Sequence, residues 1–200
     1  MIVDVWADVV CPFTHVGLVR LTGRRDAAGA DTQFRAHAWP LEWVNGQPLD
    51  PGFVADEIAA LRETVAPDLF TGFDRAVFPA SSVPALALTA AAYACGVAAG
   101  ERAALAVRHA LFERGLDVSE PEVLATLADE LDLGDLPGDP DAVRAEFDAG
   151  RACGVVGSPY FVVRDEGFFC PSLQISHDDD GFVVEFDTAA FEDFARRAGV

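Results

Sequence analysis

The feature that most restricts the fold of this chain is a strand pattern that leads directly into a helix opened by cysteine and proline. Apolar and polar side chains alternate from Ile2 to Ala7, and Cys11-Pro12 follows shortly after. Proline suits a first helical turn, because its missing N–H would have no partner there. A helix start also favours negative charge, so we expect Cys11 to be a reactive thiol with a lowered pKa. The alternative is a buried, inert cysteine.

The pattern that follows this junction predicts an α/β chain. A helix is expected from Pro12 to about Ala28, and a second strand from Thr32 to Trp39, where Pro40 ends it. The middle of the chain is helical, with helices expected at about 51–65, 82–99, 101–115, 119–131 and 140–153.

Strand patterns return near the C-terminal end. Strands are expected at 159–164, 168–170 and 181–186, before an amphipathic helix at 188–198. The order is therefore β-α-β, a block of helices, and β-β-α. This order indicates an α/β sheet domain interrupted by a helical insertion.

The charge balance excludes several classes of partner. The formal net charge is −19, and all 14 cationic side chains are arginines. Nucleic acids and anionic membranes both require basic surfaces, so we expect neither as a partner. No apolar run approaches the ~20 residues that span a bilayer. The N-terminus lacks the basic and apolar segments of a signal peptide, so we expect a cytoplasmic protein.

The cysteines do not form a metal-binding pattern. The spacing of Cys11, Cys95, Cys153 and Cys170 does not match a zinc site, and four cysteines are too few for a disulfide scaffold. The acidic run at 178–180 lacks the remaining ligand positions of a calcium loop and is read as a turn. We therefore expect no metal, and free thiols in a reducing compartment.

Two segments together carry a family resemblance. Residues 8–17, DVVCPFTHVG, and residues 157–163, GSPYFVV, resemble the DsbA-like thioredoxin superfamily. Within it, the chain is similar to FrnE-type oxidoreductases and to the related 2-hydroxychromene-2-carboxylate isomerases and kappa-class glutathione transferases. The resemblance implies an α/β thioredoxin-like fold at 1–45 and 154–200, with a helical insertion domain at 46–153. It also implies a nucleophile at Cys11 and a cis-proline at Pro159 facing it.

The chain departs from this family at Thr14. The oxidoreductases carry a second cysteine at this position, whose thiol attacks the mixed disulfide and releases the substrate. The isomerase and transferase branch instead has serine at the first position and binds a low-molecular-weight thiol. Cys11 therefore matches one branch, whereas Thr14 lacks the resolving thiol, as the other branch does. A one-cysteine cycle remains open to this chain.

Several residues near these segments are candidates for a part in the site. Thr14 could hydrogen-bond the Cys11 thiolate. His15 could stabilise the thiolate or move a proton, or it could be an exposed or capping residue. His37 is expected on the outer face of its strand, and His109 and His177 at the surface. The residues expected to bind substrate, beside the catalytic Cys11, Pro12, Thr14 and His15, are Phe13, Trp39, Ser158 and Pro159.

A resolving role for another cysteine is the less favoured interpretation. Cys153 ends the helix before the Pro159 loop and is expected to be the nearest in space, but a packing role is favoured for it. Cys170 in the terminal hairpin and Cys95 in an alanine-rich helical run are interpreted as structural residues, with Cys95 in the core.

The leading hypothesis is a thiol–disulfide oxidoreductase with Cys11 as its single nucleophile and an external thiol as the resolving agent. Its substrate would be a protein or small-molecule disulfide. No tightly bound cofactor is expected, but a glutathione- or mycothiol-type thiol could be a co-substrate. The alternatives are a small-thiol-dependent isomerase or transferase, and a binding protein without catalysis. A monomer and a homodimer both remain open.

Overall fold

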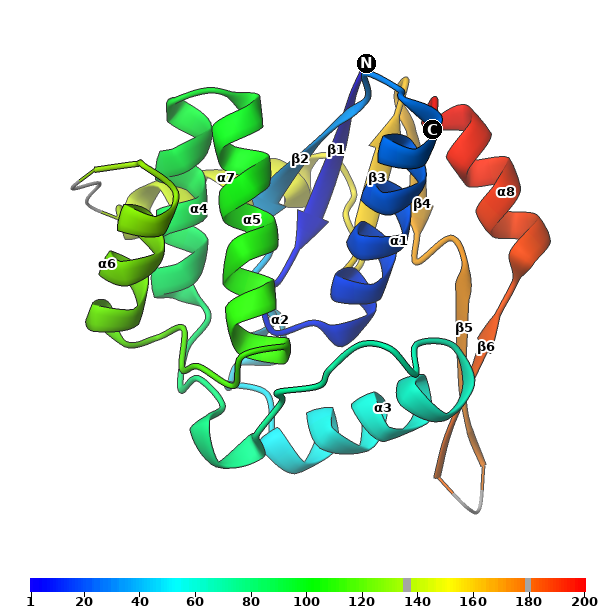
Figure 1. The fold of residues 1–200 in the computed structure, drawn as a ribbon, viewed down its shortest axis with the longest axis horizontal. Helices are drawn as coiled ribbons and strands as arrows, with labels where there is room; N and C mark the ends of the chain where they lie inside the picture. The colour runs from blue at the N-terminus through cyan, green and yellow to red at the C-terminus, as the bar shows by residue number, and fades with distance from the viewer. Residues whose placement is uncertain (135–137, 179–180) are drawn as a thin grey trace.

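A four-stranded sheet lies at the centre of the computed structural model, which describes residues 1–134, 138–178 and 181–200, with the backbone alone at 177, 178 and 181 (Figure 1). The strand order is β2-β1-β3-β4. The sheet pairs β1 in parallel with β2 and antiparallel with β3, and β3 antiparallel with β4. These strands are β1 (Ile2–Ala7), β2 (Gln33–Ala38), β3 (Tyr160–Val163) and β4 (Glu166–Phe169).

Alternation along β1 divides the packing between the two faces of the sheet. Val3, Val5 and Ala7 point to one face, where they join a buried cluster with α1 (Pro12–Ala28) and α8 (Thr188–Arg197). Trp6 points to the opposite face, where it packs with Trp39 and with Phe147 of α7 (Pro140–Ala152). Helices therefore cover both faces, as expected of an α/β arrangement.

Three of the helices between β2 and β3 pack directly on the sheet. Helices α4, α5 and α7 all contact β2. Besides α7, the helical elements of this segment are α2 (Leu41–Asn45), α3 (Pro51–Thr64), the 3-10 turn η1 (Arg75–Val77), α4 (Val83–Ala94), α5 (Val97–Phe112) and α6 (Pro121–Glu130). The division into a thioredoxin-like domain at 1–45 and 154–200 and an insertion at 46–153 remains a proposal.

The alanine-rich segment breaks earlier than predicted. The expected helix at 82–99 ends at Ala94, and α5 begins at Val97. Gly96 has a φ of 128°, a conformation that favours glycine, and it separates the two helices. Cys95 is consequently exposed at the end of α4, so the expectation that it lies in the core was wrong.

A second, two-stranded sheet follows β4. It consists of β5 (Leu173–Asp178) and β6 (Gly181–Phe186). The sequence pattern predicts β6 but not β5. Helix α3 packs on β6, and both lie past the end of β1 at which α1 begins (Figure 1). The predictions for the acidic run at 178–180 and for the side chain of His177 fall outside the described residues.

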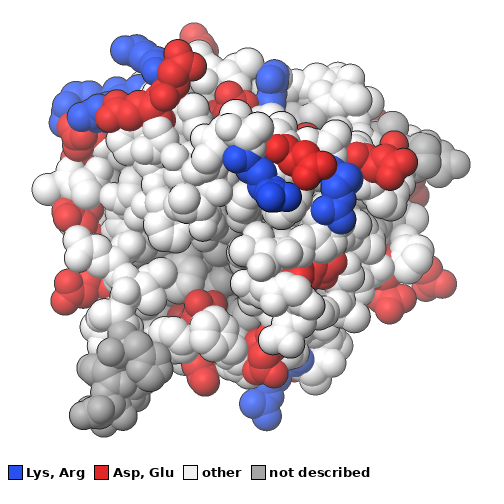
Figure 2. Space-filling model, turned by 180° about the vertical axis from the view of Figure 1, so that it is seen from behind, with Lys and Arg blue, Asp and Glu red and all other residues white. Residues whose placement is uncertain are grey.

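The charged side chains on the surface include both acidic residues and the less numerous arginines. Seen from behind, arginine side chains stand in small groups beside Asp and Glu side chains (Figure 2). Among the described helices, none is both long enough and apolar enough to cross a membrane.

His37 is part of a charged contact that attaches α7 to the sheet. Its Nε2 lies 2.8 Å from Asp4 Oδ1 on β1, and its Nδ1 lies 3.6 Å from Glu146 Oε1 on α7. The ring also stacks on Trp6. The outer face of β2, where His37 was expected, is therefore covered by α7, and His37 is half-buried. His109 is exposed, as predicted.

We expect His37 to make the stability of the protein depend on pH. Burial lowers the pKa of His37, but Asp4 and Glu146 outweigh it and raise the pKa to about 9. The stabilisation is present in full below the ordinary pKa of ~6.5 and is lost as the pH rises through about 9. Urea unfolding at pH 6 and pH 9.5 should show that the free energy of unfolding falls by about 3 kcal/mol less in H37Q than in the wild type over this range. Equal pH dependence in both proteins would contradict this role.

Candidate active site

Cys11 lies at the junction that the sequence predicted. It is the N-cap residue of α1, directly after the link from β1, and Pro12 occupies the first turn of the helix. The Cys11 side chain makes no capping hydrogen bond. Its thiol instead donates to the backbone carbonyl of Ser158, with an Sγ–O distance of 3.3 Å. Cys11 is 3% exposed, so the free thiol is almost completely covered.

Ser158 connects Cys11 to its surroundings. The Ser158 hydroxyl accepts a hydrogen bond from the backbone N–H of Asp8 at 3.0 Å and lies 3.0 Å from the hydroxyl of Thr14. Thr14 is fully buried, and the Ser158–Pro159 peptide bond is cis. Ser158, a single residue that precedes β3, thus contacts the β1–α1 link, the first turn of α1 and the candidate nucleophile.

Two buried ionisable side chains, Asp8 and Arg108, lie beneath this link. The Asp8 carboxylate accepts hydrogen bonds from Val10 N–H, Leu41 N–H and the Ser82 hydroxyl, and burial raises its pKa to about 6. The Arg108 guanidinium is 1% exposed and donates to the backbone carbonyl of Asp8 at 3.2 Å. These contacts fix the backbone that leads into Cys11 and place a cation near it.

The predicted lowering of the Cys11 pKa is wrong for the free protein. Burial raises the pKa of the thiol, because a thiolate loses its hydration there. The contacts with Ser158 and Thr14 act in the opposite direction, and the charge of Glu57 adds to the increase. The helix start alone does not offset this burial.

His15 is buried away from the thiol. Its Nε2 lies 2.9 Å from Glu113 Oε1, and its ring packs against Phe70 and Phe112. Burial lowers the pKa of His15. Burial would raise the pKa of Glu113, but the hydrogen bonds from His15, Thr71 and Phe70 lower it to about 2. His15 therefore connects α1 to α5, and its side chain makes no hydrogen bond to Cys11 within the described structure.

A cleft of about 230 Å³ opens beside Cys11. It contains four of the eight predicted site residues, namely Cys11, Pro12, Phe13 and Ser158. The other residues that line it are Leu41, Asn45, Leu49, Phe53, Glu57 and Ile175. Glu57 was missed, because in sequence it is one acid among several on an amphipathic helix. Trp39 lies outside this cleft, buried in the cluster beneath α7.

Cys170 is closer to the site than the sequence suggested. Its N–H donates to the carbonyl of Pro159 at 3.0 Å, and its thiol is buried in the same apolar cluster as Cys11. Burial, with a contribution from the charge of Cys11, raises the pKa of Cys170 to about 12.

Cys153 is exposed at the end of α7 and does not line the cleft. The expectation that Cys153 is the nearer thiol has no support in these contacts.

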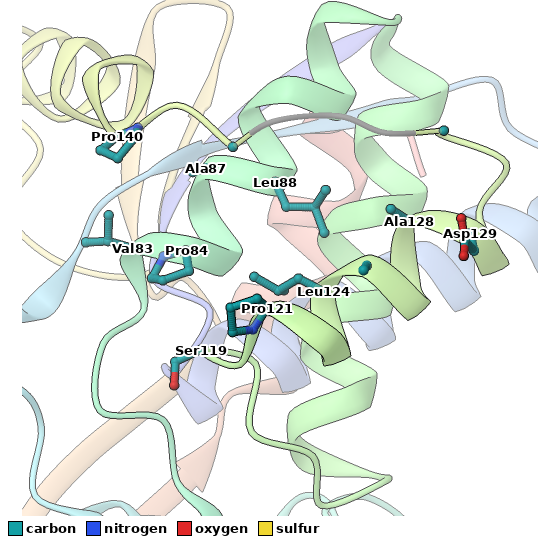
Figure 3. Close-up of a pocket in the computed structure, with 13 residues that line it drawn as sticks. Val83, Pro84, Ala87, Leu88, Ser119, Pro121, Leu124, Ala128, Asp129 and Pro140 are labelled. Carbon is teal, nitrogen blue, oxygen red and sulfur yellow. The ribbon is translucent and has the colours of Figure 1, made fainter.

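Larger cavities of the described structure do not include Cys11 in their walls. One of about 570 Å³ lies between α4, α6 and the start of α7 (Figure 3). Its walls are mostly apolar, with Leu88 and Leu124 among them and Ser119 and Asp129 as polar members. Within the described part of the chain, no group of three His, Cys, Asp or Glu side chains could hold a metal ion.

Comparisons with known proteins agree with the fold. The sequence model of the DSBA-like thioredoxin domain matches residues 2–177. The chain is similar to the cytosolic disulfide reductase DsbM from Pseudomonas aeruginosa, with a TM-score of 0.60 and 17% identity over 98% of this chain and 96% of that one. DsbM has also been solved with GSH. No curated protein sequence matches the chain at a significant level.

Two further solved structures share the fold. A 2-hydroxychromene-2-carboxylate isomerase has a TM-score of 0.60 and 20% identity, over 84% of this chain and 88% of that one. A "probable DsbA oxidoreductase" from Streptomyces coelicolor has a TM-score of 0.60 and 17% identity, over 99% of this chain and 89% of that one. At these identities the likeness establishes the fold alone.

We expect the Cys11 thiol of the free protein to titrate above the ordinary cysteine value of ~8.5. The measurement is the rate of iodoacetamide alkylation from pH 6 to pH 10.5, with modification at Cys11 followed by mass spectrometry. N-acetylcysteine in the same buffers provides the reference, and C95S/C153S removes the exposed thiols. An apparent pKa below about 7 would show that the helix start outweighs burial.

Proposed function

Because the chain belongs to the DSBA-like thioredoxin family, we propose that it is a thiol–disulfide oxidoreductase that works through Cys11 alone. The observation that carries the proposal is the placement of the thiol. Cys11 lies at the start of α1, in a cleft, with its Sγ 3.3 Å from the carbonyl that precedes Pro159. Thr14 occupies the place of a second cysteine and contacts Ser158 instead.

The proposed cycle has two exchange steps. In the first, Cys11 loses its proton to solvent, and its sulfur attacks one sulfur of a disulfide. A bond forms between Cys11 and that sulfur, the substrate S–S bond breaks, and the released thiolate takes up a proton. In the second step, the thiolate of an external thiol attacks the mixed disulfide and returns Cys11 to the thiol. One cycle exchanges one disulfide for another, and a further exchange of the product with a second equivalent of external thiol completes the reduction and leaves that thiol as its own disulfide.

The residues around Cys11 have distinct proposed roles. The free N–H groups at the start of α1 and the buried guanidinium of Arg108 favour the thiolate once a ligand has entered. Thr14 and Ser158 supply hydrogen bonds that oppose the effect of burial. The backbone at Ser158-Pro159 is available to align an extended partner, and Phe13 contributes an apolar wall.

An external thiol is proposed as the resolving agent because neither Cys170 nor Cys153 is suited to attack the mixed disulfide. Cys170 is buried, and its pKa of about 12 leaves little thiolate at neutral pH. Cys153 does not line the cleft. A glutathione- or mycothiol-type thiol would supply the missing attack, and the GSH present in one DsbM structure supports this class. We propose a cytoplasmic setting, where such thiols are reduced.

We expect turnover of a disulfide in the presence of an external thiol to require Cys11 only. C11S should lower the rate of insulin or small-disulfide reduction by at least about 100-fold, because the nucleophile is lost. A C95S/C153S/C170S variant should retain a rate within about threefold of the wild type. The rate should depend on the concentration of the external thiol.

Four outcomes would contradict the cycle. Turnover in C11S would assign the chemistry to another residue. Loss of turnover in C170S alone, with an intact fold by circular dichroism, would make Cys170 the resolving thiol. A small thiol bound without any covalent adduct at Cys11 would instead support the isomerase or transferase alternative, and an unchanged phenotype of C11S in cells would support a binding protein.

A further inference from the structure

One acidic side chain lies in the Cys11 cleft and has no part in the cycle described above. Glu57, on α3, lines the cleft together with Cys11 and Ser158. Among the residues that line the cleft, Glu57 is the only one with an acidic or basic side chain apart from the thiol itself. Its carboxyl group is therefore the principal charge that an entering ligand meets.

Within the described structure, the Glu57 carboxyl group has no counter-ion. Glu57 is half-buried, yet among the described residues it has neither a hydrogen bond nor an ion pair. Burial raises its pKa to about 7, and nothing acts in the opposite direction. The other acids beneath the site differ, since Asp8 accepts three hydrogen bonds and Glu113 pairs with His15. An unpaired carboxylate in such a place is unfavourable unless a ligand supplies the partner.

Glu57 also acts on the nucleophile. Its charge raises the pKa of Cys11, so the two groups disfavour each other's anionic forms. A cation placed between them would reverse this effect, because it attracts both the carboxylate and the thiolate. An anionic ligand would do the opposite, and the net charge of −19 adds to its repulsion.

We propose that Glu57 is a specificity-determining residue that selects disulfides carrying a positive charge close to the sulfur, of the aminothiol class. The inference rests on the proposed function and names the substrate class of that site. The ammonium group of the ligand pairs with the Glu57 carboxylate while one ligand sulfur reaches Cys11. Apolar walls at Leu41, Leu49 and Phe53 enclose the short carbon chain.

The chemistry remains that of the first exchange step. The Cys11 proton leaves to solvent, the Cys11 sulfur bonds to one ligand sulfur, and the other ligand half departs as a thiolate that takes up a proton. No additional oxidant or reductant is needed, because one disulfide replaces another. The ligand cation therefore contributes to both binding and formation of the thiolate.

The test is the rate at which Cys11 forms a mixed disulfide in a C95S/C153S background. The probes are cystamine, which is cationic, hydroxyethyl disulfide, which is neutral, and dithiodiglycolate, which is anionic. In E57Q, the rate with cystamine relative to the rate with hydroxyethyl disulfide should fall by about tenfold. The rate with dithiodiglycolate relative to the rate with hydroxyethyl disulfide should rise. D56N is the matched control, since Asp56 is an exposed acid on the same helix, and its ratios should stay within about twofold of the wild type.

The outcomes separate this inference from the function on which it rests. E57D keeps the charge and should keep the preference for cystamine, which excludes a merely structural effect of the substitution. If hydroxyethyl disulfide modifies Cys11 but E57Q leaves the ratios unchanged, or D56N changes them equally, the inference is wrong and the oxidoreductase function stands. If none of the three disulfides modifies Cys11, the proposed function fails and the inference fails with it.

Discussion

The site depends on the contact of Cys11 with Ser158, a residue 147 positions further along the chain. The Ser158 carbonyl accepts from the thiol, while the Ser158 hydroxyl contacts Asp8 and Thr14. Pairing of β1 with β3 brings these distant segments together, because it fixes the end of one strand against the start of the other. The central sheet thus determines the position of the thiol, and the surrounding helices determine its environment.

That environment explains why the pKa of the Cys11 thiol is raised in the free protein. A helix start is worth about 0.3–1 kcal/mol to a nearby charge, whereas full burial can shift a pKa by several units. Cys11 is almost completely covered, and Glu57 adds a like charge. Burial therefore outweighs the helix start. A ligand that brings a cation into the cleft changes this balance, which connects substrate choice with activation of the nucleophile.

Sequence reasoning located the parts of the site that depend on local chemistry. The Cys11-Pro12 helix start, the strand pattern at Ile2 to Ala7 and the family fold all follow from short motifs, and the structure and the family match confirm them. The burial of Cys11 could not be predicted, because it depends on how α2, α3 and β5 close over the end of the sheet. Glu57 and the closeness of Cys170 to Cys11 were missed for the same reason, since only tertiary packing places these residues near Cys11.

The most direct test of this account is a crystal structure of the protein with cysteamine joined to Cys11 as a mixed disulfide. We predict that the adduct occupies the cleft, with its sulfur beside Ser158 and its ammonium group within hydrogen-bond distance of the Glu57 carboxylate. Cys170 should remain a free thiol in the same crystal. An adduct whose amine extends into solvent away from Glu57, or a disulfide between Cys11 and Cys170, would contradict the account.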